Sequence, residues 1–439
     1  MKVCLPFSKT KRYLTGMDWS IAALDDMNRR TTGGTNSSQI VLELSGPFDD
    51  GRFRSAIADF VRQFPVLGGV VTRDWNLAPY WKMPRPGCAP SVPVKTETVP
   101  ESDLFQALAR SANARFPDKR QHLAFRVFHT GERRHFVAMH FDHLLFDARG
   151  AENFLELFHR WYRGEDCDAR IAQIALTESA HLCKWKRKFE AGKLLVRTLR
   201  AFRETTLVLF RRPLPLKGRG FTFALMEFGE RESQAITDRA YREAGFLMFM
   251  PYALAVVVQA LDAVRKRNGV SGQDFLVSVS VDLRTPDTVA AKLFFNHVSF
   301  MFFRIPVAVT GNRQQTIDAV RSQMYEQIKS KSPQAMAESS MLMRILPLSL
   351  LSRLILRPLR GEFASLGFAY VGKGGYACSE FMEARVTNLF HMPLIPVPPG
   401  LGFVVNQFGS RVNVVLSHMD GMLSDEDVRT IQDDVRRGL

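Results

Sequence analysis

A stretch with two prolines and two glycines near the middle of the chain, residues 205–221 (TTLVLFRRPLPLKGRGF), is the clearest break in its pattern of helices and strands. Proline and glycine interrupt regular structure, so we expect a linker there. The chain has 439 residues, which is more than one hydrophobic core usually organises. We therefore predict two subdomains, 1–214 and 215–439, that meet near residue 215.

Apolar residues recur at helical or strand spacing in both halves, which predicts an α/β protein. In the first half the patterns predict helices over 17–30, 51–64, 104–115 and 147–164, strands over 38–45 and 66–74, and a hairpin over 123–143. In the second half they predict strands over 221–228, 274–283, 296–307 and 383–390, helices over 231–245, 247–267 and 312–330, and a hairpin over 403–418. The halves are alike in the kinds of element they contain, without a repeat at residue level.

An HxxxD sequence, His143 to Asp147, follows the first predicted hairpin. Alone it is a weak motif, because with ten histidines about one chance match is expected in every two such chains. Its setting adds specificity, since the histidine ends an apolar strand (FVAMHFDH) and a helix begins directly after the aspartate. A histidine held at the mouth of a rigid scaffold suits a general base. The alternative is that His143 only caps the strand end.

Three further segments accompany this motif: Val281–Arg284 (VDLR) at a strand end, Phe295–Ser299 (FNHVS) before a strand, and Thr387–Leu389 (TNL) near the C-terminus. In their order and spacing the chain resembles the HHxxxDG acyltransferase superfamily. That superfamily includes chloramphenicol acetyltransferase, condensation domains of nonribosomal peptide synthetases, and wax ester synthase/diacylglycerol acyltransferases. The resemblance covers nearly the whole chain. It implies two similar α/β subdomains with mixed sheets and an active-site tunnel at their interface.

The resemblance also implies an activity, the transfer of an acyl group from a thioester to a hydroxyl or amine acceptor. The donor would be acyl-CoA or an acyl-phosphopantetheine on a carrier protein, used as a co-substrate, with no permanently bound cofactor. His143 would take the acceptor's proton and later protonate the leaving thiol. Asp147 would shape the loop by pairing with Arg284 rather than act on the substrate.

The tetrahedral intermediate of such a reaction needs a hydrogen-bond donor about 3 Å from its oxyanion. By position, Thr387 and Asn388 are the candidates, although an asparagine at a strand end usually caps or turns the chain. Asn296 and Arg284 are expected to be structural.

Two positions depart from the superfamily's motif. Asp142 stands where relatives usually have a first histidine, and Ala148 stands where they have glycine. Glycine takes a positive φ freely, whereas alanine does so at a cost of about 1 kcal/mol or more, so we expect the loop to bend differently or to use Gly150 instead. Both departures also leave open a catalytically degenerate member that binds a carrier or lipid without turnover.

Metal and disulfide sites are not expected. The five cysteines are scattered and include no CxxC pair. His140 and His143 fall on opposite faces of an alternating strand, which disfavours a metal site made with Asp147. No signal-peptide core is present near the N-terminus, so we expect a cytoplasmic protein.

The net charge of +15 is unevenly spread, with twelve Lys or Arg against two Glu between Lys184 and Arg219. Leu195, Leu199 and Phe202 fall on one side of a predicted amphipathic helix in this segment. Together with 341–360, which mixes leucines with arginines, segment 184–219 suits peripheral contact with an anionic membrane surface or with an acidic carrier protein. A solvated face packed on its own domain is the alternative. No nucleic-acid-binding motif is present.

The sequence thus favours a thioester-dependent acyltransferase, whose acyl donor or acceptor is lipidic if the two leucine- and arginine-bearing segments face a membrane. Two alternatives remain. One is a carrier-dependent condensation enzyme that forms an amide, and the other is the degenerate binding protein. A requirement for an acylated carrier distinguishes the first, and absence of thiol release distinguishes the second.

Overall fold

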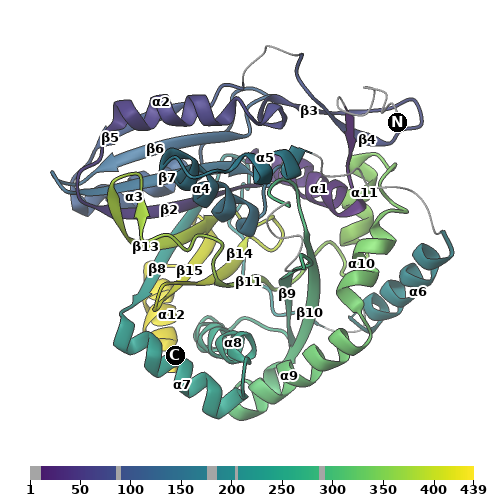
Figure 1. Cartoon of the computed structure of the whole chain (residues 1–439). Helices are drawn as coiled ribbons and strands as arrows, with labels where there is room; N and C mark the ends of the chain where they lie inside the picture. The colour runs from purple at the N-terminus through teal and green to yellow at the C-terminus, as the bar shows by residue number, and fades with distance from the viewer. Residues whose placement is uncertain (1–10, 86–89, 176–184, 203–205, 286–291) are drawn as a thin grey trace.

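Two six-stranded mixed sheets form the framework of the protein (Figure 1). The computed structural model describes residues 11–85, 90–175, 185–202, 206–285 and 292–439. The first sheet has the order β12 (Glu380–Phe381), β13 (Ala384–Pro393), β2 (Ser37–Ser45), β7 (Arg134–Asp142), β6 (Leu123–His129) and β5 (Val94–Thr98). The second has the order β10 (Val298–Pro306), β9 (Asp274–Asp282), β11 (Leu366–Lys373), β14 (Leu401–Phe408), β15 (Arg411–Met419) and β8 (Phe221–Phe228). The predicted mixed α/β fold is therefore confirmed.

Both sheets are mixed because each contains parallel and antiparallel pairs. In the first sheet β5 runs parallel to β6, and in the second β11 runs parallel to both β9 and β14. A small third sheet joins β1 (Lys11–Tyr13), β4 (Pro79–Lys82) and β3 (Val70–Arg73). The predicted boundary near residue 215 stays a prediction, and the topology adds that β12 and β13 from the second half complete the first sheet.

Helices cover the sheets where their apolar faces match. α2 (Asp50–Val61) and α4 (Ala148–Tyr162) pack on one face of the first sheet through a cluster rich in phenylalanine. α3 (Glu101–Ala112) packs on the other face of the first sheet, in a hydrophobic cluster that also includes residues of the second sheet. The remaining helices are α1 (Gly16–Thr31), α5 (Asp168–Ala175), α6 (Trp185–Phe202), α7 (Glu230–Ala244), α8 (Phe249–Arg267), α9 (Arg313–Lys329), α10 (Ser332–Ser340), α11 (Leu348–Leu356) and α12 (Asp425–Gly438), with short 3-10 turns at Pro65–Gly68 and Val307–Val309.

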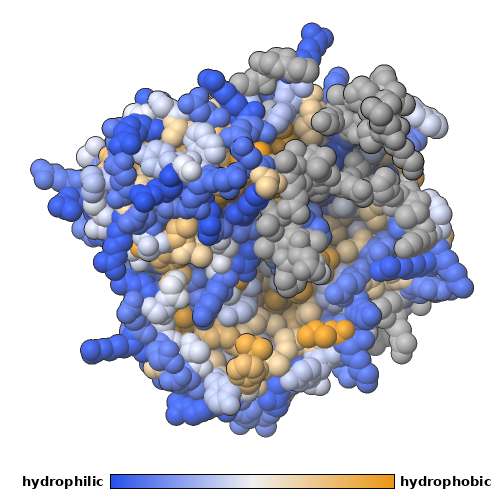
Figure 2. Space-filling view, in the orientation of Figure 1, coloured by the Kyte–Doolittle hydropathy of each residue, from blue (hydrophilic) through white to orange (hydrophobic). Residues whose placement is uncertain are grey.

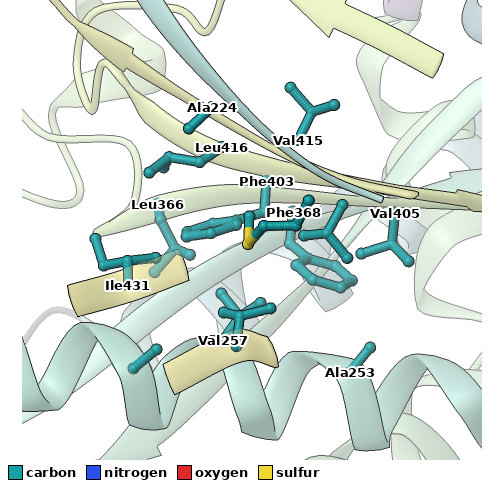
Figure 3. Packing of buried hydrophobic residues seen from close by; sticks show 14 of the residues in the cluster. Ala224, Ala253, Val257, Leu366, Phe368, Phe403, Val405, Val415, Leu416 and Ile431 are labelled. Atoms are coloured by element: carbon teal, nitrogen blue, oxygen red, sulfur yellow. The ribbon is translucent and has the colours of Figure 1, made fainter. Parts of the chain in front are cut away.

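The core of the second half forms between its sheet and helices α8 and α12. Figure 3 shows Val257 and Ala253 of α8 and Ile431 of α12 facing Phe368 and Phe403 of the sheet. α8 is apolar around most of its circumference, as expected of a helix buried on several sides. α1 packs instead against α10 and α11, so the N-terminal helix rests on the second half.

The predicted helices and strands are present with ends shifted by a few residues, except that 66–74 begins as a 3-10 turn and becomes β3 only at Val70. The elements that were not predicted include β11, α5, α10, the small strands β1, β4, β5 and β12, and the terminal helix α12. β11 carries Gly367 and Gly372, which weaken a strand pattern.

Candidate active site

The HxxxD loop connects the end of β7 to the start of α4, at the level where the two halves meet. Asp147 is the N-cap of α4, and its Oδ1 accepts the N–H of Gly150 at 2.8 Å. The aspartate of the motif therefore has a structural role, because it caps the helix by accepting an otherwise unpaired N–H of the first turn.

Asp147 also joins the two halves through a buried ion pair. Arg284 donates to its Oδ1 at 2.8 Å, and the main-chain N–H of His297 donates to its Oδ2 at 2.9 Å. Both charged side chains are about 1–2% exposed. Burial acts to raise the pKa of Asp147, but Arg284 outweighs it, so this pKa lies below its usual range. The contact between Asp147 and Arg284 predicted from the sequence is present.

Arg284 is itself held in place by the chain around it. Its Nε donates to the carbonyl of Lys292 at 2.9 Å and its Nη1 donates to Asp282 at 3.1 Å. The guanidinium therefore spans from the end of β9 to the segment that leads into β10, and reaches Asp147 with geometry already set.

His143 is fixed by its main chain rather than by its ring. Its N–H donates to the carbonyl of Asn36 at 3.1 Å, and its own carbonyl accepts from Nδ2 of Asn296 at 2.7 Å. The side chain is half-buried, and its Nδ1 is buried with no hydrogen-bond partner among the described residues. One contact comes from each half of the chain, so the imidazole is positioned by both.

The backbone of the loop lies very close to the second half. Phe146 pairs with Phe295 in an isolated parallel bridge. At Gly150, an added Cβ would lie 2.2 Å from the carbonyl oxygen of Leu293, so only glycine fits there. Ala148 has no positive φ. An alanine at position 148, where the superfamily's motif has glycine, therefore does not strain the loop. The residue that must be glycine is Gly150, where the loop lies against the carbonyl of Leu293.

Thr387 and Asn388 lie far from His143 along the sheet. In the register of the strands, β2 places Ser37 opposite Asp142 and Glu43 opposite Asn388. Ser37 and Glu43 are six positions apart, which corresponds to about 20 Å along a strand. The structure does not bring Thr387 and Asn388 to the histidine, so we do not assign them to an oxyanion site.

Asn388 instead belongs to a buried amide network between the two sheets. Its side chain exchanges hydrogen bonds with Asn413 at 2.8 and 3.2 Å, and it also donates to Glu227. Its Oδ1 accepts the N–H of Leu389 at 2.8 Å. Thr387 lies at a bulge of β13 and donates to the carbonyl of Glu43 at 3.3 Å.

Sequence reasoning missed a buried carboxylate that supports the site from the N-terminus. Asp18 accepts the main-chain N–H of Asn296 at 3.1 Å while it forms a capping box with Thr15. Burial raises the pKa of Asp18, although nearby Arg12 opposes this. Arg12 itself lies over the ring of Phe295, 3.2 Å from its centroid, and burial lowers its pKa to about 10. The spacing of Thr15 and Asp18 could have predicted the capping box, but it does not indicate that Asp18 also binds Asn296.

A second buried polar contact between the halves was also missed. Glu152, one turn into α4, accepts from His391 of β13 at 2.8 Å and from the N–H of Gly375. The two partners lie more than 200 residues from Glu152 in the sequence, and no motif links them.

His140 is separate from these contacts. It stacks on Phe116 with ring centroids 4.7 Å apart, and burial lowers its pKa to about 4. Within the described parts of the chain, no group of three or more His, Cys, Asp or Glu side chains is arranged to hold a metal ion. Among the same residues no single helix is long and apolar enough to cross a membrane, although α7 and α8, bent by 95°, pass that test as a pair.

The surface between the two halves is hollowed on one face, and apolar residues form the floor of the hollow (Figure 2). A different cleft, of about 550 Å³, opens between β8, α12 and Phe105 of α3. Glu227, the partner of Asn388, lines this second cleft, and the residues of the HxxxD loop do not.

Comparison with known proteins gives no match to a protein-family model and no significant match to a curated protein sequence. Solved structures share the fold along nearly the whole chain. The trichothecene 15-O-acetyltransferase of Fusarium sporotrichioides has 12% identity and a TM-score of 0.68, over 99% of this chain and 98% of that one.

Two other solved structures extend the comparison. The first condensation domain of the calcium-dependent antibiotic synthetase has 16% identity and a TM-score of 0.68, over 98% of this chain and 96% of that one. The wax ester synthase/diacylglycerol acyltransferase of Marinobacter aquaeolei VT8 has 12% identity and a TM-score of 0.60, over 97% of both chains. At these identities the likeness concerns the fold, and it confirms the fold expected from the HHxxxDG resemblance.

Proposed function

We propose that the protein is an acyltransferase that moves an acyl group from a thioester to a hydroxyl or amine acceptor, with His143 as its general base. The observation that carries this proposal is the state of His143. Its main chain is anchored to Asn36 and Asn296, one from each half, while its Nδ1 has no partner among the described residues. An imidazole held at the junction of two lobes and left free at the ring is suited to proton transfer.

The chemistry needs few groups, because a thioester is already activated. His143 accepts the proton of the acceptor's hydroxyl or amine as the oxygen or nitrogen attacks the thioester carbonyl. The tetrahedral intermediate then collapses, the C–S bond breaks, and the imidazolium returns the proton to the departing thiolate. The products are an ester or amide and a free thiol, and the histidine ends in its starting form.

Asp147 and Arg284 act on this site indirectly. Both are buried and paired with each other, so neither carries a free charge toward a substrate. Their pair fixes the start of α4 against residues 282–285 and 292–297 and so holds the loop in which His143 lies. We assign both residues, with Asn296, to positioning.

The donor is proposed to be acyl-CoA or an acyl-phosphopantetheine on a carrier protein. Solved structures with this fold include an acetyltransferase, a condensation domain and a wax ester synthase, so the fold alone does not select among these donors. A carrier-dependent condensation enzyme and a binding protein without turnover remain the alternatives.

Free-thiol release tests the proposal. Purified protein is incubated with short- and long-chain acyl-CoAs and a mixture of alcohols and amines, with His143→Ala as the control. We expect thiol release that depends on an acceptor and on His143. Release only from an acylated carrier protein would identify the condensation enzyme. Binding of acyl-CoA without release from either donor would identify the degenerate binding protein.

We further propose that one surface contacts an anionic membrane, which would supply a lipidic substrate. α6, α10 and α11 lie along one side of the molecule (Figure 1), and α6 exposes Trp185 and Phe189 beside Lys186. α11 exposes Leu350, Arg353 and Leu354, and Arg357 is exposed directly after the helix. The side chains of 194–202, and so of Leu195, Leu199 and Phe202, and all of 184 and 203–205, lie outside the described residues.

The turn between β3 and β4 extends this surface. Arg73 donates to the carbonyls of Ile345 and Leu346, which places the turn beside the segment that leads into α11. At its tip Trp75 is 90% exposed. Exposed tryptophan with leucine and arginine is typical of interfacial contact. In flotation at physiological salt we expect the natural protein to bind vesicles with anionic phospholipid and Trp75→Ala to bind them more weakly. Equal recovery of the natural protein with anionic and with neutral vesicles would contradict the proposal.

A further inference from the structure

His122 lies directly beneath the HxxxD loop, just before β6 begins at Leu123. Its carbonyl accepts the N–H of Asp142, the residue that precedes His143. Its ring Nδ1 lies 2.9 Å from Oδ2 of Asp142, and its Nε2 lies 2.9 Å from the carbonyl oxygen of Gly69. The side chain is 6% exposed, so water does not compete for these contacts.

Both partners of the His122 ring are hydrogen-bond acceptors. A carbonyl oxygen only accepts, and an ionised carboxylate only accepts. A neutral imidazole carries one N–H and can satisfy only one of the two. The geometry therefore requires the imidazolium, which carries both.

Asp142, which directly precedes His143, also holds the three residues that follow this histidine. Its Oδ1 accepts the N–H of Leu144 at 2.9 Å, and its carbonyl accepts the N–H groups of Leu145 and Phe146. Movement of Asp142 would therefore move the residues that flank His143 on both sides.

We propose that His122 is a positioning residue for His143, a buried imidazolium that ties Asp142, and with it the HxxxD loop, to the carbonyl of Gly69. The effect of His122 on catalysis rests on the proposed function, whereas the positive charge of its ring does not. Asp142, the departure from the superfamily's motif, is then the counter-ion that keeps this histidine protonated.

The groups around the pair favour the charged form. Burial acts to lower the pKa of His122, but Asp142, with smaller contributions from the carbonyl of Gly69 and from Asp118, outweighs it, so the pKa is raised. Burial acts to raise the pKa of Asp142, but His122 and the N–H of Leu144 outweigh it, so that pKa is lowered.

The remaining neighbours are the ring of Trp81, which meets His122 edge-on at 4.9 Å, and the ion pair of Asp25 with Arg29 on α1. A raised pKa means that the contact persists to a higher pH than an ordinary histidine would allow. It is lost as the pH rises through the pKa of His122, when one ring nitrogen is left facing an acceptor.

Nitrogen NMR of the labelled protein tests the charge without any assay of turnover. Long-range proton–nitrogen correlation distinguishes an imidazolium from either neutral tautomer, and His122→Gln assigns the ring signals. We expect both ring nitrogens of His122 to be protonated at neutral pH and the ring to titrate above the ordinary range of a histidine. A neutral His122 at neutral pH would overturn the proposal.

Asp142→Asn separates charge from shape. The amide oxygen can still accept the N–H of Leu144, while the amide nitrogen now faces Nδ1 of His122 as a donor. His122 can then be neutral, with its one N–H on Gly69. We expect the His122 titration to move to lower pH in this variant. The loss of kcat/KM that we expect in the natural protein as the pH rises through the pKa of His122 should then disappear.

His122→Ala tests the positioning. An unpaired buried carboxylate should displace the loop, and we expect kcat/KM to fall on the order of 10²-fold. His129→Gln is the matched control, because His129 also contacts an aspartate, Asp50 at 2.9 Å, but at the opposite end of the β6–β7 hairpin. It should retain natural activity.

The ring signals of His143 separate failure of this inference from failure of the proposed function. If the natural protein releases no thiol, the acyltransferase proposal fails, yet the chemical shifts of the His143 ring should still respond to the titration of His122. If His143 does not respond to the titration of His122, or His122→Ala keeps full kcat/KM, the positioning role is overturned.

Discussion

The HxxxD loop and the Thr387–Asn388 segment of β13 both join the two halves through buried polar groups, but they use those groups differently. Both amide atoms of Asn388 are committed to Glu227, Asn413 and the adjacent main chain. His143 is held only by its main chain, and its Nδ1 has no partner among the described residues. A side chain whose polar atoms are all occupied inside the protein has none left for a substrate. His143 is therefore the better catalytic candidate of the two, because its half-buried ring makes no hydrogen bond within the described residues.

His143→Ala should show the largest functional effect in this comparison. Loss of the general base should lower kcat/KM for thiol release by about 10²- to 10⁴-fold. Because the ring makes no hydrogen bond within the described residues, the free energy of unfolding should change little. Urea unfolding measured beside the kinetics checks both. A variant that unfolds much more easily but, while folded, keeps its activity would reverse the assignment.

Arg284→Met should give the largest loss of stability, about 3–5 kcal/mol, because it leaves Asp147 buried and unpaired. In the natural protein the lowered pKa of Asp147 contributes stability that is present above its unfolded pKa of about 3.9 and is lost as the pH falls through its folded pKa. In the variant, burial without Arg284 raises that pKa, so protonation relieves the unpaired charge at a higher pH.

The gap in unfolding free energy between the natural protein and Arg284→Met should therefore be widest near neutral pH and narrow as the pH falls. Urea unfolding across this range measures it. Arg52→Met is the control, because Arg52 pairs with Glu383 at 2.6 Å and both side chains are about half exposed. It should cost less than about 1 kcal/mol. A gap that does not vary with pH would show that Asp147 does not depend on Arg284 for its charge.

The sequence could predict the pair of Asp147 with Arg284 because both residues lie in recognisable segments. It could not predict Asp18, Glu152 or His122 as supports, because their partners are brought close only by the packing of the two halves. The distance of Asn388 from His143 could not be predicted for a related reason. This distance is fixed by the register of β13 on β2, which includes a bulge, and a register between strands more than 300 residues apart is not visible in one sequence.

Asn388→Ala should show the reverse of His143→Ala, with lower stability and retained activity per folded molecule. The loss of its amide leaves Asn413 without a partner on that side, and an unsatisfied buried group costs about 1–3 kcal/mol. A double-mutant cycle with Asn413→Ala measures the coupling between the two amides. A large loss of kcat/KM with unchanged stability would return Asn388 to the active site.

Ala148→Gly should have the smallest effect, although it restores the residue that the superfamily's motif carries at this position. Ala148 has no positive φ and begins α4, so it gains nothing from the freedom of glycine. Glycine in a helix costs about 0.5–1 kcal/mol relative to alanine, and less near a helix end. We therefore expect a small drop in unfolding free energy and an unchanged kcat/KM. A clear gain in kcat/KM would mean that Ala148 restrains the loop after all, and that anchoring through Asp142, Asp147 and Gly150 is not sufficient to set the position of His143.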